Sequence, residues 1–137
     1  FRDNIHIINQ VNMCFVSLLD SVGPKSAALV FSYPRYSSEV QRITEILSKK
    51  KVPIIGVTDS KLSPIIPLSS TYLITPQKYI ILADASASAI ALIHALMVAM
   101  YRKNSNNIKK RLEKYEKNIL ETDMFVFKDY NFVKNLK

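Results

Sequence analysis

The sequence is poor in the residues that most catalytic and structural motifs require. It has one cysteine, two glycines, two histidines and no tryptophan among 137 residues. The single cysteine, Cys14, excludes an intramolecular disulfide and favours a reducing compartment, so we expect a cytoplasmic protein. The two isolated glycines, Gly23 and Gly56, exclude both a dinucleotide-binding fingerprint and a P-loop. His6 and His94 have no metal-ligating neighbours at ligand spacing, so we expect neither a metal nor another cofactor.

Long apolar runs and targeting segments are also missing. The long uncharged, alanine-rich run at 85–100 has 16 residues, whereas a membrane-spanning helix needs about 20 predominantly apolar residues. We therefore expect a buried helix of a core or interface, and no membrane partner. No signal peptide is recognisable near Phe1. Because the first residue is not Met, we expect a piece of a longer protein. The length suits a single domain, 1–137, with a core at 1–101 and a helical extension at 102–137.

The positive charge is concentrated towards the C-terminal end. The net charge is +8, with 9 Lys/Arg against 6 Asp/Glu in residues 1–100 and 10 against 5 in residues 101–137. A basic helix at 101–117 could bind nucleic acid. It could equally be a solvated surface, because Glu113 and Glu116 interrupt the basic run. The second interpretation is the more common one for such a helix.

Hydrophobic patterning alternates between short continuous apolar runs and segments of helical period. Apolar runs of this kind are typical of strands buried in a parallel sheet. We expect strands at 4–9, 27–32, 52–60 and 71–76, and helices at 10–22, 37–51, 84–101 and 106–121. Strands that alternate with helices predict an α/β fold, with three layers in a doubly wound arrangement around a mostly parallel sheet of four strands.

Polar residues gather where the second and third predicted strands end. Ser32 ends one strand, and Ser37 and Ser38 precede the helix that follows it. Thr58 and Asp59 end the next strand, followed by Ser60 and Ser63 before a short turn. Ligands of open parallel sheets bind at the carboxyl ends of the strands, and helix N-termini attract anions. Hydroxyl groups and free amides at this edge suit a phosphate monoester.

Helix capping alone also explains some of these serines. Ser38 and Gln41 form a capping-box pattern, and Ser63 before Pro64 is a typical N-cap followed by proline at the first helical position. Both interpretations stay open for each serine considered alone. Their clustering at the ends of two strands shifts the balance towards a ligand site.

Two segments resemble the SIS (sugar isomerase) domain of RpiR-type bacterial transcription regulators. "FSYPRYSSEV", residues 31–40, resembles the family pattern of a buried strand, Ser-x-Ser-Gly-x-Thr and a helix. Ser32 matches the first serine, Ser37 the Thr/Ser position, and Glu39 the start of the helix. "VPIIGVTDSKLSPIIPLSSTYLITP", residues 52–76, resembles the next segment of the family. The resemblance covers about residues 5–121 and implies the SIS-type, flavodoxin-like arrangement of the fold.

The sequence departs from the family pattern at two places. Pro34 and Arg35 occupy the positions of the second serine and the glycine, and Arg35 could supply a guanidinium in place of an amide. A Pro-Arg-Tyr-Ser version occurs in a branch of these regulators, which favours a regulator over an enzyme. The family's first strand-helix unit is lacking, as is the helix-turn-helix domain that precedes SIS in such regulators.

The resemblance implies a non-enzymatic effector domain that senses a phosphorylated sugar and alters DNA binding by a helix-turn-helix domain outside this sequence. The predicted sugar-phosphate site consists of Ser32, Arg35, Ser37, Ser38, Thr58, Ser60 and Ser63. Two alternatives stay open. One is a sugar-phosphate isomerase, for which Glu39 and His94 are the candidate general bases. The other is a structural dimerisation module whose ligand site has decayed.

The resemblance also implies a homodimer, and the helical segments offer a surface for it. Helix 84–101 carries no charged residue after Asp84. In the following helix, a short heptad seam is formed by Ile108, Leu112, Tyr115 and Ile119. Two heptads are too few for a stable isolated coiled coil, so we expect the seam to pack on a partner or on its own domain.

Overall fold

The structure is a computed structural model that describes residues 4–77, 86–122, 126 and 133. Predictions that concern the segments between these ranges, including the first residues of the predicted helix 84–101, lie outside the described residues. The chain divides into two compact units, one formed by residues 6–92 and the other mainly by residues from 93 onwards. The prediction of a single domain, 1–137, stays a prediction.

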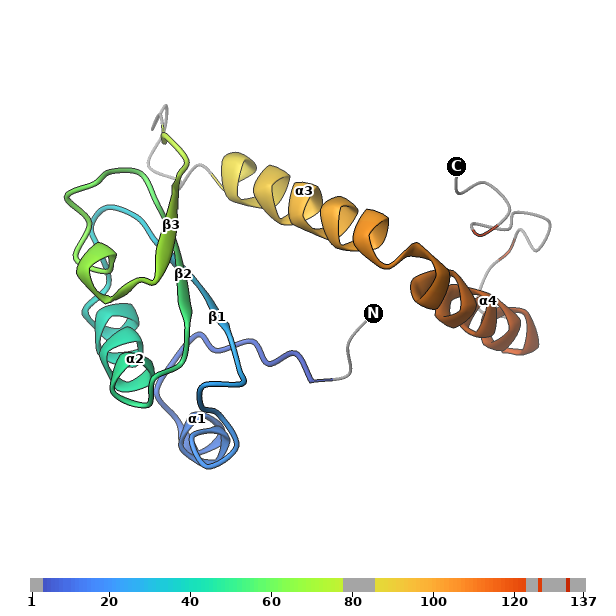
Figure 1. Cartoon of the computed structure of the whole chain (residues 1–137), viewed down its shortest axis with the longest axis horizontal. Helices are drawn as coiled ribbons and strands as arrows, with labels where there is room; N and C mark the ends of the chain where they lie inside the picture. Colours follow the sequence, from blue (N-terminus) through green and yellow to red (C-terminus); the bar gives the residue numbers. More distant parts are fainter. Residues whose placement is uncertain (1–3, 78–85, 123–125, 127–132, 134–137) are drawn as a thin grey trace. The chain divides into compact units, whose positions relative to one another are not determined.

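The first unit is built on a parallel sheet of three strands (Figure 1). The strands are β1 (Ala28–Ser32), β2 (Ile54–Thr58) and β3 (Thr71–Ile74), in the order β1-β2-β3. Both neighbouring pairs are parallel, with β1 and β3 on either side of β2. The predicted α/β class with a parallel sheet is therefore confirmed, and three of the four predicted strands are present.

The fourth predicted strand, at 4–9, is wrong. These residues form no strand in the described part of the chain. Ile5 is 67% exposed and Ile7 is 93% exposed, so these two side chains bury little apolar surface. β-Branched residues favour strands mainly by packing on a pleated surface. Without a ladder partner the composition of this segment does not produce a strand.

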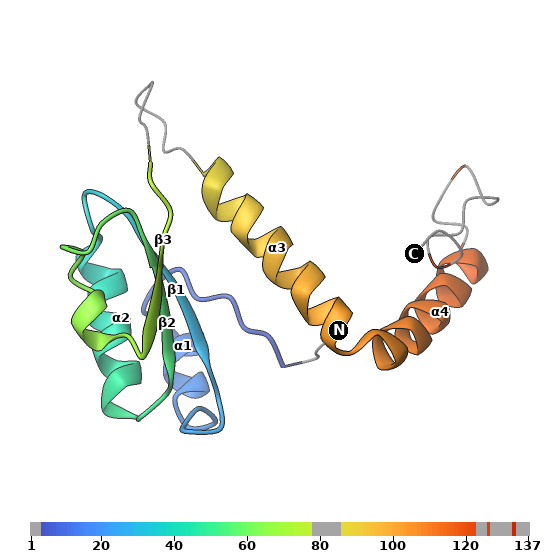
Figure 2. The same cartoon turned by 45° about the horizontal axis from the view of Figure 1, so that its top comes forward.

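Three helical segments accompany the sheet. They are α1 (Met13–Leu18), α2 (Ser38–Lys49) and the 3-10 turn η1 (Ile66–Leu68). Helix α2 contacts both β1 and β2, and Figure 2 shows it along one side of the sheet. The predicted helix at 37–51 is confirmed to within about two residues at its ends. The helix predicted at 10–22 is much shorter, because Asn12 caps it at one end and Leu19 ends it at the other.

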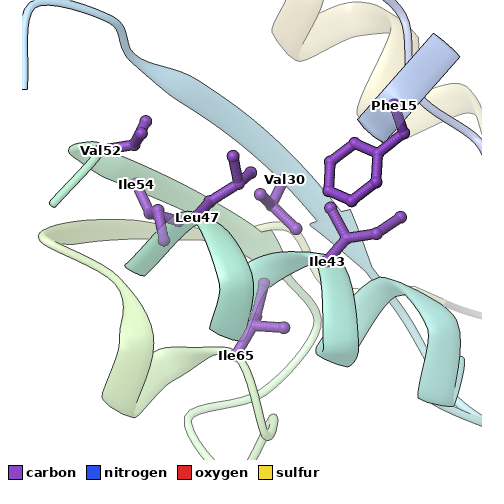
Figure 3. Packing of buried hydrophobic residues seen from close by; sticks show 7 residues of the cluster. All are labelled: Phe15, Val30, Ile43, Leu47, Val52, Ile54 and Ile65. Carbon is purple, nitrogen blue, oxygen red and sulfur yellow. The ribbon is translucent and has the colours of Figure 1, made fainter. Parts of the chain in front are cut away.

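The core lies between α2 and the sheet (Figure 3). Every second residue of a strand points to the same face, and Val30 and Ile54 supply the sheet side of this core. Ile43 and Leu47, four residues apart on α2, supply the opposite side, as the helical period predicted. Phe15 of α1 joins the same cluster. On the other face of β1, Leu29 is 40% exposed.

Gly56, in the middle of β2, permits the segment around η1 to approach the sheet closely. A Cβ placed on Gly56 would lie 2.6 Å from Ser69 Oγ and 3.3 Å from Ile65 Cδ1. Ser69 Oγ is itself held in place, because it donates a hydrogen bond of 2.8 Å to the carbonyl oxygen of Ile65. Only glycine leaves room for this packing.

A Schellman motif connects α2 to β2. The amide of Val52 donates to Leu47 O at 3.1 Å, and the amide of Lys51 donates to Ser48 O at 2.9 Å. Lys51 adopts a φ of 58°, the left-handed conformation that this motif requires at its turning residue and that glycine usually supplies. The motif brings Val52 and Leu47 into the same buried cluster.

Cys14 is exposed, although it lies in a helix next to the buried Phe15. On α1 only Phe15 is buried, and Leu18 is half-buried. One helix face of six residues has room for few core positions, and Phe15 takes the central one. Cys14 therefore presents its thiol to the surface.

The second unit contains most of α3 (Ala87–Lys103) and all of α4 (Ser105–Glu121). Both helices were predicted. Asn104 separates them, so that α4 begins directly after α3 ends. Of the predicted seam on α4, Ile108 is buried, Leu112 and Ile119 are half-buried, and Tyr115 is exposed. The opposite face of α4 carries exposed lysines, one of which, Lys117, lies 3.9 Å from Glu121.

Helix α3 is apolar but has no buried residue. Large apolar side chains along it are exposed in the chain by itself: Ile90, Ile93, Met97, Val98 and Met100. His94, on the same helix, is also exposed. No helix within the described ranges is long and apolar enough to cross a membrane.

Candidate ligand site

The carboxyl ends of the three strands meet at one edge of the sheet. Ser32, the last residue of β1, is in register with Thr58, the last residue of β2, and Thr58 is in register with Ile74 of β3. The next residues along the chain are Tyr33, Asp59 and Thr75. This is the edge at which open α/β sheets bind ligands.

The N-terminus of α2 lies in the segment that follows β1. Ser37 is its N-cap: the extended backbone of Ser37 turns into the helix, and its Oγ accepts a hydrogen bond of 3.5 Å from the amide of Val40. The first amides of a helix have no partner within the helix and carry the positive end of its dipole. Ser37 therefore stands where an anion would meet the helix.

The predicted capping box of Ser38 and Gln41 is wrong. Ser38 is the first helical residue and not the cap, and the amide of Gln41 donates to the carbonyl oxygen of Ser37. The side chain of Gln41 does not turn back to the cap, because it donates a hydrogen bond of 3.1 Å to Glu45. Serine is a good N-cap residue at either position, and the backbone decides which of the two caps the helix.

The predicted site residues of the first segment differ in exposure. Ser32 is 4% exposed, whereas Arg35, Ser37 and Ser38 are exposed. Arg35 is in none of the salt bridges found among the described residues, so its guanidinium is free of a carboxylate there. The exposed groups can meet a ligand from solution, whereas Ser32 is buried at the end of β1.

The second segment is more buried. Thr58 is fully buried, and its Oγ1 donates a hydrogen bond of 3.2 Å to Asp59 Oδ1. Ser60 Oγ accepts a hydrogen bond of 3.2 Å from the amide of Leu62. Thr58 and Ser60 are thus engaged in shaping their own loop, and the donor hydrogen of Ser60 stays available.

Ser63 does not cap a helix as predicted. The N-cap position of η1 is Ile65, and no side chain caps it. Ser63 is 2% exposed, and its Oγ makes no hydrogen bond within the described residues. A buried hydroxyl with no partner costs about 1–3 kcal/mol. The residue therefore has unused hydrogen-bonding capacity in the segment after β2.

Two tyrosines connect the strand ends, and the sequence analysis did not identify either. Tyr36 Oη donates a hydrogen bond of 2.9 Å to Asp59 Oδ1, joining the segment before α2 to the end of β2. Tyr33 Oη lies 2.5 Å from Thr75 Oγ1, joining the ends of β1 and β3. Tyr36 has a φ of 50°, which is rare for a bulky residue and occurs often at binding sites. The only sequence signal was two tyrosines beside the serine cluster.

The two candidate general bases, Glu39 and His94, belong to different units of the chain. Glu39 Oε1 accepts a hydrogen bond of 2.6 Å from the amide of Val11, which fixes the carboxylate on the N-terminal segment. His94 belongs to the second unit and is exposed. A search of the described residues for three or more clustered metal-ligating side chains finds none.

The chain matches known proteins in both sequence and fold. The sequence profile of the SIS domain matches residues 12–102. The fold is similar to the crystal structure of the sugar isomerase domain of an RpiR transcription factor from Sphaerobacter thermophilus, with a TM-score of 0.73 and 15% sequence identity. That comparison covers 80% of this chain and 62% of the other. Among curated proteins no sequence matches.

The framework of this chain, a parallel sheet with serines at and after the ends of its strands, is thus that of an SIS domain. The chain belongs to the SIS domain family. The resemblance to the SIS domain is confirmed, and the fold is similar to that of the RpiR sugar isomerase domain.

Proposed function

We propose that this chain is the sugar-phosphate-sensing, dimer-forming effector domain of an RpiR-type transcription regulator. The observation that carries the proposal is the arrangement at the sheet edge. The capped N-terminus of α2 at Ser37 and the unpaired hydroxyl of Ser63 both follow strands whose last residues are in register. Amides and hydroxyls in this arrangement suit a phosphate monoester.

The role of each residue follows from its exposure. Ser37 donates its hydroxyl hydrogen to the phosphate while its oxygen keeps the cap, since one hydroxyl can do both. Arg35 and Ser38, both exposed, complete the anion's shell from solution. The wall of the site at the sheet edge consists of Ser32, Thr58, Ser60 and Ser63.

DNA binding belongs to a separate helix-turn-helix domain, and the protein acts in the cytoplasm.

An effector role is preferred to catalysis because the fold is similar to that of a transcription factor's domain. An isomerase must move a proton between carbons, so it needs a base at the ligand. Within the described residues, Oε1 of the candidate base Glu39 is held by the amide of Val11, whereas Oε2 keeps its acceptor positions. Turnover measurements therefore decide between the two functions.

Calorimetric titration with glucose 6-phosphate and fructose 6-phosphate tests the proposal. Ser37→Asp keeps a capping oxygen but places a negative charge against the phosphate, so we expect binding weaker by about tenfold or more. Ser38→Ala is the matched control at the neighbouring position and should reduce affinity less. Equal affinities of wild type and Ser37→Asp would contradict the phosphate site. Turnover of either sugar phosphate would favour the isomerase alternative.

Helix α3 supports the dimer part of the proposal. Its large apolar residues, among them Met97 and Val98, are exposed. A second copy of the chain would remove this surface from water. Sedimentation at micromolar concentration should give a dimer, and Met97→Lys should shift it towards the monomer. A wild-type protein that sediments only as a monomer would contradict the dimer.

A further inference from the structure

A carboxylate stands at the same edge as the proposed phosphate site, and the proposed function gives it no role. Asp59 directly follows β2, the middle strand, and its side chain is half-buried. A phosphate and a carboxylate repel each other at short range. A bound phosphate would therefore lie away from this carboxylate.

Asp59 is fixed by two hydroxyls that bind the same oxygen. Tyr36 Oη and Thr58 Oγ1 both donate to Oδ1, at 2.9 Å and 3.2 Å. Thr58 is fully buried and belongs to the middle strand of the sheet. The carboxylate thus has a defined orientation in the absence of any ligand.

The second oxygen, Oδ2, makes no hydrogen bond within the described residues, and no described lysine or arginine forms a salt bridge with Asp59. An ionised carboxylate has about four acceptor positions and no donor. Only the two on Oδ1 are engaged. Asp59 therefore offers an unneutralised negative charge and free acceptor positions at the sheet edge.

The hydrogen bond from Tyr36 fixes where this charge lies relative to the anion site. Tyr36 immediately precedes Ser37, the N-cap of α2. The Tyr36 hydroxyl joins Asp59 to the short segment that carries the proposed phosphate ligands Arg35, Ser37 and Ser38. Asp59 and the N-terminus of α2 are therefore connected through a single side chain, that of Tyr36, at the same edge of the sheet.

We propose that Asp59 is the specificity-determining residue of the site and selects sugar monophosphates whose remaining groups are uncharged hydroxyls. Oδ2 accepts hydrogen bonds from these hydroxyls. The same charge rejects ligands with a second anionic group, such as sugar acids and bisphosphates, because like charges in contact are strongly unfavourable. The inference rests on the proposed function and adds the ligand class.

The test compares two pairs of ligands that differ in one anionic group. Glucose 6-phosphate is paired with 6-phosphogluconate, and fructose 6-phosphate with fructose 1,6-bisphosphate. Calorimetry gives the ratio of affinities within each pair. For the wild type we expect the monophosphate of at least one pair to bind better by about tenfold or more. Asp59→Asn keeps an oxygen for Tyr36 but removes the charge, so we expect this preference to fall to within about threefold.

Two further variants make the result specific. Asp20→Asn removes the same charge from an exposed position in the same unit and should leave the preference unchanged. Tyr36→Phe keeps the charge but removes one of the two hydroxyls that orient it, so we expect an intermediate preference. This second variant tests the role of Asp59 even if Asp59→Asn fails to fold.

The outcomes separate the two proposals. If the wild type binds a monophosphate but Asp59→Asn or, where that variant does not fold, Tyr36→Phe keeps the full preference, the role of Asp59 is wrong and the sensing function stands. A wild type that binds both members of each pair equally also overturns the role of Asp59. If the wild type binds none of the four ligands, the sensing function fails and the specificity inference fails with it.

Discussion

Tyr33 Oη lies 2.5 Å from Thr75 Oγ1, although the two residues are 42 positions apart in the sequence. Tyr33 directly follows β1 and Thr75 directly follows β3, so the contact spans the end of β2 between them. The amide of Thr75 also donates to Thr58 O at 2.8 Å. The three strand ends are therefore tied together by contacts outside the ladder.

Removing the Tyr33 hydroxyl should lower stability modestly. We expect Tyr33→Phe and Thr75→Val each to reduce the free energy of unfolding by about 0.5–1.5 kcal/mol, as the loss of one hydrogen bond does. Because they remove the same interaction, the double variant should lose less than the two single losses combined. Urea denaturation of the four proteins measures this coupling. Strictly additive losses would show that the two hydroxyls do not bind each other.

Replacing Gly56 should be costly. The new Cβ of Gly56→Ala would come within 2.6 Å of Ser69 Oγ, so the chain around η1 must shift. Overpacking of this kind costs about 1–3 kcal/mol. Gly23→Ala is the matched control, because a Cβ at Gly23 meets nothing within 4 Å. Thermal denaturation should separate the two variants clearly, and equal midpoints would contradict the close approach at Gly56.

The cap at Ser37 predicts a difference between adjacent serines. Ser37→Ala removes the oxygen that accepts from the amide of Val40 and should cost about 1 kcal/mol of stability. Ser38→Ala lies inside the helix, where alanine is the best helix former, and should be neutral or slightly stabilising. Denaturant midpoints measured without ligand check this order. The reverse order would restore Ser38 as the cap.

Lys51 offers a stabilising substitution. Its φ of 58° strains any residue with a Cβ, so Lys51→Gly should raise the free energy of unfolding by about 0.5–1 kcal/mol. Lys49→Gly, two residues earlier and still helical, is the matched control and should lower it by a similar amount. In urea denaturation we expect the free energy of unfolding to rise for Lys51→Gly and to fall for Lys49→Gly. A loss of stability in both variants would argue against a left-handed Lys51.

Local patterns predicted the elements that bury a regular face. The four-residue spacing of Ile43 and Leu47 identified α2, and the continuous apolar runs identified β1 and β2. Residues 4–9 have the same composition as a strand but lack a ladder partner, which no local pattern reports. The N-cap of α2 was predicted one residue too late for a related reason: Ser37 and Ser38 carry the same side chain, and the sequence alone does not show which of them caps the helix.

The site was predictable only where it follows from topology. Parallel strands bring Ser32 and Thr58 to one edge, so their register could be anticipated from the fold. The hydrogen bond from Tyr36 to Asp59 depends on the left-handed backbone at Tyr36 and on the three-dimensional course of two loops. Neither periodicity nor propensity contains that information, and tyrosine has many other roles in a core.

The Schellman motif after α2 has a consequence for how fast the protein folds. Its hydrogen bond joins residues only five positions apart, Leu47 and Val52, and β2 begins two residues later, at Ile54. Contacts of short sequence separation cost little loop-closure entropy, so we expect this corner to form before the parallel strands pair. Lys51→Gly should then accelerate refolding and leave the unfolding rate nearly unchanged. Stopped-flow kinetics would show this as a shift of the refolding arm of the chevron plot alone. A shift confined to the unfolding arm would mean that the Schellman motif forms only after the transition state of folding.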